Sequence, residues 1–196
     1  MRLFAAVDVP EDIRQEIAAW WAAACVHLPA GDWRDVAVRN WHVTLAFYGE
    51  VRGDEVDDLA EALADCAATA SPLILRTGAC GVFPNASRPR VFWGGVGSVD
   101  GAKDLAYLAR CCRLAGHVTL RKHTAKEAPF RGHITLARAL PDAAPLGGEV
   151  WQSLPDLPVL EWTVGAVSLY ASQLRPQGPI YRLVEAFEFK GNHHVR

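Results

Sequence analysis

The sequence predicts an α+β fold with two similar lobes, and three observations lead to this prediction. Strand-like and helix-like segments alternate along a chain of 196 residues, of which 51% are hydrophobic. Several consecutive strand-like segments are joined by turns too short for a helical crossover, which favours antiparallel pairing over a wound parallel sheet. The pattern His-x-Thr-Leu recurs in two strand-like contexts, at His42–Leu45 and His133–Leu136. We therefore expect residues 1–196 to form a single bilobal domain with two pseudo-repeated lobes.

The first part of the chain predicts two strands, each followed by a helix. A β-like run over residues 2–9 is followed by a proline and two acidic residues, which are typical of a helix start and predict a helix over 11–28. After a loop, residues 40–50 form an apolar, β-branched strand that carries His42. Residues 53–71 have an acidic beginning and apolar residues at helical spacing, which predicts a second helix.

The middle of the chain predicts a hairpin and a third helix. Residues 73–83 and 90–96 are β-rich and are joined by the turn-like sequence PNASRP, so we expect them to pair. Residues 102–114 show helical spacing, and Gly116 stands where a glycine often caps the end of a helix. We therefore expect His117 to lie just beyond this helix.

The last part of the chain predicts three strands and a short helix. Residues 131–140 form the strand that carries His133, and a short helical segment is expected around residues 148–154. Two strong strand signals, over 160–172 and 179–189, are separated by QLRPQG and predict a hairpin.

Composition limits the classes of partner. The net charge of -2 lacks the basic excess of proteins that hold nucleic acid through many phosphate contacts, so any RNA should be bound locally. No apolar stretch approaches the roughly 20 residues of a membrane-spanning helix, and no signal-peptide pattern is present, so we expect a cytoplasmic protein that binds no membrane. The five cysteines include no C-x-x-C pair, so we expect free, mostly buried thiols and no structural zinc.

The two His-x-Thr patterns suggest acid–base chemistry. Alternation along a β-strand places His42 and Thr44 on one face, and His133 and Thr135 likewise share a face. If the two strands face each other across a cleft, two imidazoles and two hydroxyls meet there. One neutral imidazole could take a proton from water while one imidazolium protonates a leaving oxygen, and the hydroxyls could bond phosphate oxygens. This set of groups suits phosphodiester cleavage without a metal ion.

Longer stretches of the sequence resemble a known family. NWHVTLAFYGEV (40–51) and PFRGHITLAR (129–138) resemble the two His-x-Thr-x signatures of the two-histidine (2H) phosphoesterase superfamily. RLFAAVDVP, GVFPNASRPRVFWGGV and VSLYASQLRPQGPIYRLVEAFEF extend the likeness over nearly the whole chain. The sequence is similar to the bacterial and archaeal RNA 2',3'-cyclic phosphodiesterases, historically called 2'-5' RNA ligases, of the ThpR/LigT type.

This resemblance implies a fold in which two antiparallel-rich sheets flank a central cleft, with helices outside. It implies hydrolysis of an RNA or nucleoside 2',3'-cyclic phosphate to the 2'-phosphate, with no cofactor and no metal, and a reverse reaction that would form a 2'-5' linkage. By the same resemblance His42 is the general acid, His133 is the general base, and Thr44 and Thr135 hold the phosphate. We expect a monomer whose partners are RNA ends or nucleotides that carry the cyclic phosphate.

The resemblance also points to residues around the motifs. Arg138 matches a family arginine associated with the phosphate, although simple alternation places it opposite His133, so a bulge or a strand end would be required. Arg131 shares the face of His133 by periodicity and is a second candidate for holding phosphate. Phe47 matches a family position near the nucleobase, where a ring could stack. Gly132 stands where the family often has proline, and glycine restricts the start of the strand less.

Other interpretations remain open at this stage. A single His-x-Thr in a strand is more often a structural pair, so the recurrence of the pattern is what favours a site. A third copy begins at His117, in a different context, and we expect it to lie outside the site. The protein could instead be a non-catalytic module that binds RNA ends. It could also be a metal-dependent phosphoesterase, although the carboxylate cluster of two-metal sites is missing from the sequence.

Overall fold

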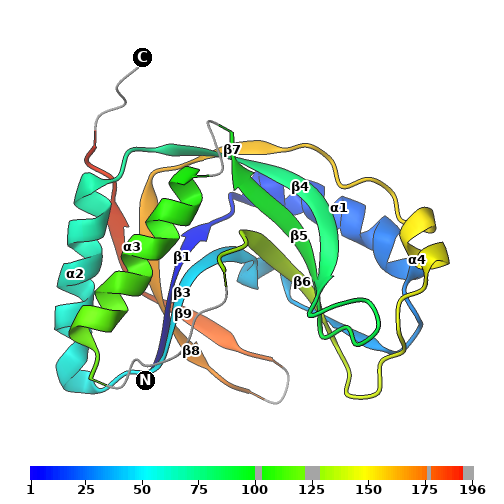
Figure 1. The fold of residues 1–196 in the computed structure, drawn as a ribbon, viewed down its shortest axis with the longest axis horizontal. Helices are drawn as coiled ribbons and strands as arrows, with labels where there is room; N and C mark the ends of the chain where they lie inside the picture. The colour runs from blue at the N-terminus through cyan, green and yellow to red at the C-terminus, as the bar shows by residue number, and fades with distance from the viewer. Residues whose placement is uncertain (100–102, 122–128, 176–177, 192–196) are drawn as a thin grey trace.

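The computed structural model describes residues 1–99, 103–121, 129–175 and 178–191 (Figure 1). These residues form one curved antiparallel sheet with helices packed beside it. The predicted α+β class is therefore confirmed.

Most predicted elements are present, with altered ends. The strands are β1 (Arg2–Asp8), β2 (Trp33–Asp35), β3 (His42–Glu50), β4 (Leu73–Phe83), β5 (Val91–Ser98), β6 (His133–Ala139), β7 (Glu161–Val164), β8 (Ala166–Gln173) and β9 (Ile180–Glu188). The helices are α1 (Glu11–Ala24), α2 (Val56–Thr69), α3 (Lys103–Thr119) and α4 (Gly148–Ser153), and short 3₁₀ turns span Cys25–His27, Val38–Asn40 and Gly53–Glu55. The short strand β2 had no counterpart among the predicted elements.

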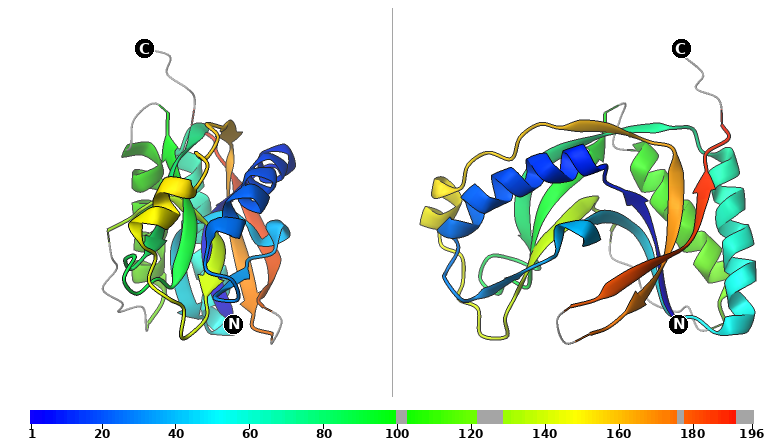
Figure 2. Two further views of the ribbon diagram at one scale, coloured as in Figure 1. Left: turned by 90° about the vertical axis from the view of Figure 1, so that its right-hand side faces the viewer. Right: turned by 180° about the vertical axis from the view of Figure 1, so that it is seen from behind.

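The strands are hydrogen-bonded in the order β7-β4-β5-β6-β3-β1-β8-β9, and β2 pairs with β6. Two sheets were expected, but the two halves are joined into one because β3 and β6 pair through Val43 and Ile134. Both of these side chains are buried, at 0% and 1% exposure. Figure 2 shows the sheet bent into an arch, and the strand order places β3 and β6 at its middle.

Each half of the sheet has its own pair of helices. Figures 1 and 2 show α2 and α3 beside the half with β1, β3, β8 and β9, and α1 and α4 beside the half with β4, β5 and β6. In the first half, the Tyr48 hydroxyl of β3 donates a hydrogen bond to the Cys112 carbonyl of α3 at 2.9 Å. In the second, Trp21 of α1 and Trp151 of α4 pack on Phe92 of β5, with ring centroids 5.1 and 6.1 Å apart. The prediction of two pseudo-repeated lobes is consistent with this arrangement and stays a prediction.

The predicted end of the third helix is wrong. α3 continues to Thr119, so that Gly116 is an internal residue and His117 lies within the helix. A glycine inside a helix costs roughly 1 kcal/mol relative to alanine. Burial offsets this cost, because Gly116 and the adjacent Ala115 both lie on the packed face of the helix.

The predicted single strand over residues 160–172 is also wrong. The chain divides at Gly165 into β7, which pairs with β4, and β8, which pairs with β1. These partners belong to different halves of the sheet, so the segment crosses from one half to the other. The predicted hairpin of 160–172 with 179–189 is confirmed only for its second part, in which β8 pairs with β9.

The remaining general predictions concern thiols, metals and membranes. All five cysteines are free, as predicted, but only Cys112 is buried and the other four are half-buried. Within the described ranges, no three His, Cys, Asp or Glu side chains gather into a potential metal site. None of the helices in the described part of the chain combines the length and hydropathy that crossing a bilayer requires.

Gly132, just before β6, has a steric role. Its carbonyl accepts a hydrogen bond from the Val96 N–H at 2.9 Å. A β-carbon at Gly132 would collide with the carbonyl oxygen of Val96 and press on Leu105 of α3. The missing side chain therefore lets the start of the second motif strand lie close to β5.

Gly132→Ala should lower the free energy of unfolding by about 1–3 kcal/mol, because the added methyl group must displace backbone atoms of β5. Chemical denaturation of the wild type and the variant measures this difference. Gly97→Ala is the matched control, because Gly97 lies in β5 and a β-carbon there meets nothing within 4 Å. Equal stability of the two variants would show that the protein accommodates a β-carbon at Gly132 without cost.

Candidate active site

The two histidine motifs lie side by side at the middle of the sheet. β3 and β6 are antiparallel, and their one paired position lies between the histidine and the threonine of each motif. Extending this register by one residue sets His42 next to Thr135 and Thr44 next to His133. Because side chains alternate, all four leave the sheet on the face opposite the buried core. Each histidine thus lies on the same face as its threonine, as predicted, and the two pairs lie on the same face of the sheet.

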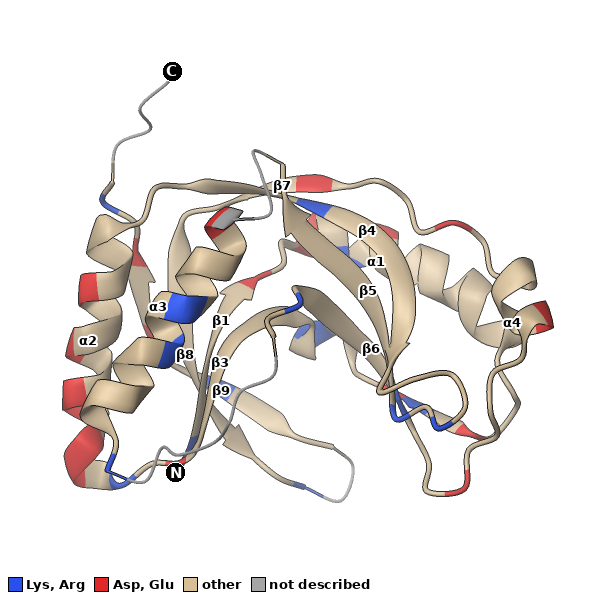
Figure 3. Ribbon diagram, in the orientation of Figure 1, with Lys and Arg blue, Asp and Glu red and all other residues tan. Residues whose placement is uncertain are grey.

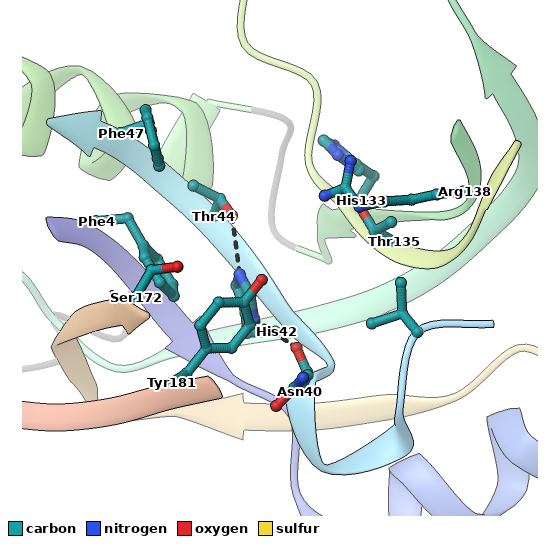
Figure 4. Close-up of a pocket in the computed structure, with 11 residues that line it drawn as sticks. Phe4, Asn40, His42, Thr44, Phe47, His133, Thr135, Arg138, Ser172 and Tyr181 are labelled. Atoms are coloured by element: carbon teal, nitrogen blue, oxygen red, sulfur yellow. Dashed lines mark hydrogen bonds between the residues drawn. The ribbon is translucent and has the colours of Figure 1, made fainter. Parts of the chain in front are cut away.

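These four side chains line one small pocket of about 120 Å³ (Figure 4). The pocket is lined by Phe4, Val36, Asn40, His42, Thr44, Phe47, His133, Thr135, Arg138, Ser172 and Tyr181. In Figure 4, His42 and Thr44 lie on one side and His133, Thr135 and Arg138 on the other. The structure therefore brings together every predicted site residue except Arg131.

Arg138 reaches the pocket because the β6 strand contains a bulge. Adjacent residues of β5 pair with Ala137 and Thr135, which leaves Leu136 as an extra residue. Leu136 and Ala137 both face the core, at 0% exposure each. The alternation is thereby shifted by one position, and Arg138 emerges on the same face as His133. A bulge or a strand end was expected here if Arg138 was to reach the site, and the bulge is present.

Phe47 reaches the pocket by the same device in β3. Adjacent residues of β1 pair with Ala46 and Thr44, so Leu45 is the extra residue. Leu45 and Ala46 both face the core, at 1% and 2% exposure. Phe47 and Arg138 therefore occupy equivalent places in the two motifs, one with an aromatic ring and the other with a guanidinium.

Few positions along the strands at the middle of the arch are Lys, Arg, Asp or Glu (Figure 3). Among the described residues that line the pocket, Arg138 is the charged one, and none has a carboxylate. An anionic group such as a phosphate would therefore meet the positive charge of Arg138, together with the hydroxyls and imidazoles of the motifs.

His42 is held at both ring nitrogens. Its Nδ1 lies 2.7 Å from the Asn40 carbonyl, and its Nε2 lies 3.0 Å from Thr44 Oγ1. A carbonyl oxygen can only accept, so Nδ1 carries a proton and Nε2 is the nitrogen that titrates. Burial lowers the pKa of His42 below 6.5, although the Asn40 carbonyl and the charge of Asp8 oppose this change. The ring stacks on Phe4 with centroids 4.8 Å apart.

His133 is held in the same way at one nitrogen. Its Nδ1 donates to the Arg131 carbonyl at 2.7 Å, which again leaves Nε2 as the titrating nitrogen. Burial lowers the pKa of His133 below 6.5, and the positive charges of Arg138 and Arg131 lower it further, against the effect of the Arg131 carbonyl. The Phe83 ring meets the imidazole edge-on, with centroids 5.0 Å apart.

The side chain of Arg131 does not line the pocket. Its guanidinium lies over the rings of Phe83 and Trp93, 5.9 and 5.5 Å from their centroids. Residue 131 precedes the first strand residue, His133, so strand periodicity does not set its direction. This placement does not support the prediction that Arg131 holds phosphate. Its contribution to the site is the carbonyl that orients His133.

The third copy of the motif lies outside the pocket. His117 is exposed on α3 and is not among the pocket-lining residues. The expectation that it takes no part in the site agrees with this placement. The structural reason differs from the one expected, because His117 is part of a helix and is not just beyond one.

Five pocket-lining residues were not predicted from the sequence: Phe4, Val36, Asn40, Ser172 and Tyr181. Phe4 could have been found, because alternation along β1 is the same signal that oriented the motif strands. Tyr181 meets His42 edge-on at 5.3 Å and Phe4 at 5.0 Å. Its position depends on the pairing of β9 with β8, where it lies opposite Ser172. No local pattern indicated that this hairpin would stand beside the motif strand.

Phe47 offers a ring surface at the rim of the pocket. Its side chain is 48% exposed, so part of the ring is open to solvent. The guanidinium of Arg2 lies 5.4 Å from the ring centroid and covers one face. A planar group could therefore stack on the uncovered part of the ring.

Comparisons with known proteins agree with this geometry. The family model described as LigT like Phosphoesterase matches residues 7–93. An RNA 2',3'-cyclic phosphodiesterase from Thermus thermophilus is 34% identical over 195 residues, which cover 98% of this chain and 92% of that protein. A second phosphodiesterase of this description, from Thermotoga maritima, is 30% identical over 97% of each chain.

Solved structures of similar proteins share the fold. A protein from Thermus thermophilus superposes with a TM-score of 0.78 and 32% identity, covering 98% of this chain and all of that one. Escherichia coli LigT in complex with 3'-AMP superposes with a TM-score of 0.77 and 28% identity, covering 96% of this chain and 97% of that one. With the full-length similarity to the curated relatives, this places the chain among the LigT-like phosphoesterases: it is an enzyme of the RNA 2',3'-cyclic phosphodiesterase family, a family of hydrolases.

Proposed function

We propose that the protein hydrolyses the 2',3'-cyclic phosphate of an RNA end or a nucleoside to the 2'-phosphate, with two histidines and without a metal ion. The observation that carries the proposal is the pair of imidazoles in one small pocket. In each, Nδ1 donates a hydrogen bond to the backbone carbonyl of the residue two positions earlier. In both rings Nε2 is thereby the nitrogen that can exchange a proton with a substrate, and in His42 it would give up its contact with Thr44 Oγ1 to do so. The activity of the relatives and the 3'-AMP bound to Escherichia coli LigT support the choice of substrate class.

The reaction needs one proton acceptor and one proton donor. Neutral His133 takes a proton from water through Nε2 while the water oxygen attacks phosphorus. The bond from phosphorus to the 3' oxygen breaks, and that oxygen takes a proton from Nε2 of the His42 imidazolium. The products are a 2'-phosphate and a 3' hydroxyl, and proton exchange with solvent restores both histidines. Each transfer contributes roughly 10²–10⁴-fold.

The charges around the histidines support this assignment of roles. Arg138 and Arg131 both disfavour the imidazolium form of His133, which suits a base that must be neutral. His42 stacks on the face of Phe4, and an aromatic face stabilises a cation above it. Pairs of titratable groups whose surroundings differ in this manner commonly divide the acid and base roles.

The phosphate would be held by Thr44, Thr135 and Arg138. When Nε2 of His42 is neutral it accepts the Thr44 hydroxyl proton. Once Nε2 is protonated, the Thr44 hydroxyl is released to donate to a phosphate oxygen, and the Nε2 proton is directed to the leaving 3' oxygen. Thr135 stands in the equivalent place beside the other histidine. The Arg138 guanidinium can supply charge-assisted hydrogen bonds to the oxygens that gain charge in the transition state. Phe47 would stack on the nucleobase.

In the ligating direction an RNA 5' hydroxyl would take the place of water. His133 would take its proton as the 5' oxygen attacks phosphorus, the bond from phosphorus to the 3' oxygen would break with a proton from His42, and a 2'-5' linkage would form. This ligation stays a prediction. A non-catalytic RNA-end module is the alternative that the first experiment separates.

His42→Ala and His133→Ala should each lower hydrolysis of 2',3'-cyclic AMP by roughly 10²–10⁴-fold, because each removes one proton-transfer group. The measurement is product formation in excess chelator, with the 2'-phosphate identified by ³¹P NMR. His117→Ala is the matched control and should keep wild-type activity, because His117 lies exposed on α3.

Loss of wild-type activity on chelation would replace this mechanism with a metal-dependent one. An inactive wild type that still binds RNA ending in a cyclic phosphate would favour the binding module.

The pH profile of kcat/KM should be bell-shaped with its maximum below pH 6.5. Activity rises as His133 loses its proton and falls as His42 loses its proton, and the pKa of each is lowered in the free enzyme. The kcat profile should lie at higher pH, because bound phosphate favours both imidazolium forms. A profile without a high-pH decline would remove the general acid from the mechanism.

Arg138→Met should lower kcat/KM by roughly 10- to 100-fold, because a charge-assisted hydrogen bond to the phosphate is lost. Arg131→Met is the matched control, because Arg131 also lies near His133 but packs on Phe83 and Trp93. Arg131→Met should lower kcat/KM by several-fold at most. Equal losses in the two variants, measured by steady-state kinetics, would contradict the specific role of Arg138.

A further inference from the structure

A carboxylate lies opposite His42 across its strand pair, whereas the position opposite His133 carries none. Asp8, the last residue of β1, lies opposite His42 in the β1–β3 register. Residues opposed across antiparallel strands have β-carbons about 4.5–5.5 Å apart. Asp8 and His42 also line a second pocket, of about 300 Å³. The residue opposite His133 in β5 is Gly95, which has no side chain. The two motifs therefore differ in what faces each histidine across the strand pair.

The Asp8 carboxylate is held in place by two hydroxyl groups of β8. Ser168 Oγ donates to Asp8 Oδ2 at 2.7 Å, and the Tyr170 hydroxyl donates to Asp8 Oδ1 at 2.6 Å. Ser168 is only 2% exposed, so its hydroxyl is fixed within the packed sheet. Burial and the charge of Asp8 raise the pKa of Tyr170, which keeps its hydroxyl protonated as a donor. Both carboxylate oxygens are thus oriented from the same strand.

The other charges near His42 act against its protonation. The titratable and charged groups that face it are Asp8 in β1, Tyr170 in β8, Tyr181 in β9, His133 and Arg138 in β6, and Arg14 and Arg39 at the second pocket. His133 and Arg138 lower the pKa of His42, whereas Asp8 raises it. Arg14 is already paired with Glu11 at 2.6 Å. Among the described residues in this set, Asp8 alone carries a charge that favours the imidazolium.

We propose that Asp8, oriented by Ser168 and Tyr170, is a positioning residue that favours the protonated form of His42, the form that a general acid requires. This inference rests on the proposed function, in which His42 donates the proton. Asp8 acts through His42 and takes no proton itself. Gly95 offers His133 no such side chain across the strand pair, so the imidazolium form is favoured from the neighbouring strand at His42 and not at His133.

Asp8→Asn tests this role, because it removes the charge and keeps the shape. Without the charge, the His42 imidazolium is less stable, so the high-pH decline of kcat/KM should move to lower pH. Above that decline, activity should fall by roughly three- to tenfold, with little loss at the low-pH side. Asp8 is solvent-exposed, so the shift should shrink as salt is added. ¹⁵N NMR titration of His42 should show the same shift without any turnover.

Two further variants control the experiment. Asp8→Glu keeps the charge and should retain more of the wild-type pH profile than Asp8→Asn. Asp142→Asn makes the same change in net charge at an exposed position after β6 and should leave the profile unchanged. If Asp8→Asn does not fold, Tyr170→Phe removes one of the two donors and should move the high-pH decline in the same direction by a smaller amount.

The outcomes separate this inference from the proposed function. If His42→Ala is inactive but Asp8→Asn loses activity equally at every pH, or keeps the wild-type profile, Asp8 has no electrostatic role. An unshifted His42 titration in Asp8→Asn would overturn the inference in the same way. If His42→Ala keeps wild-type activity, the general-acid assignment itself is wrong.

Discussion

The pairing of Val43 with Ile134 is the contact on which the site depends. It is the paired position that joins β3 to β6, and through it the two halves of the sheet. A slip of one residue would turn every motif side chain to the opposite face. Burial of each aliphatic side chain, which contributes roughly 1.5–3 kcal/mol, opposes such a slip. The hydrophobic core therefore decides which polar atoms meet, and the histidines and threonines themselves need not hold the strands together.

The same core sets the two bulges. In each motif strand a leucine and the following alanine both face the interior, which regular alternation does not allow. The extra residue lets both the leucine and the alanine point into the core. The side chain that follows then points to the pocket face instead of the core face. Two residues with different chemistry, Phe47 and Arg138, are brought to the pocket for one reason. The apolar residues between the polar positions are thus as necessary to the site as the polar ones.

Local patterns predicted the parts of the fold that local forces decide. Alternation oriented His42 and His133 correctly, because strand geometry alone fixes the face of a side chain. Gly116 is a strong helix-stop signal in isolation, but burial of that helix face outweighed it. The chain divides at Gly165, and the two half-sheets join, because of pairing with strands that are distant in sequence. A short stretch of sequence does not contain those strands. Arg131 was predicted to face the site because strand periodicity was extended to it, but β6 begins two residues later, so that periodicity does not apply there.

Phe47 and Arg138, which stand five residues after His42 and His133, differ in chemistry, and this difference affects which ester bond of the substrate is broken. A five-membered cyclic phosphodiester has two ester oxygens, and a pocket with identical ends would accept the ring in either sense. Either oxygen could then depart, and a mixture of isomeric monoesters would result. With a flat hydrocarbon ring at Phe47 and a cation at Arg138, the two senses of binding differ in free energy. On the proposed mechanism, Phe47 and Arg138 determine which isomer forms, because they fix the sense in which the ring lies between the acid His42 and the base His133.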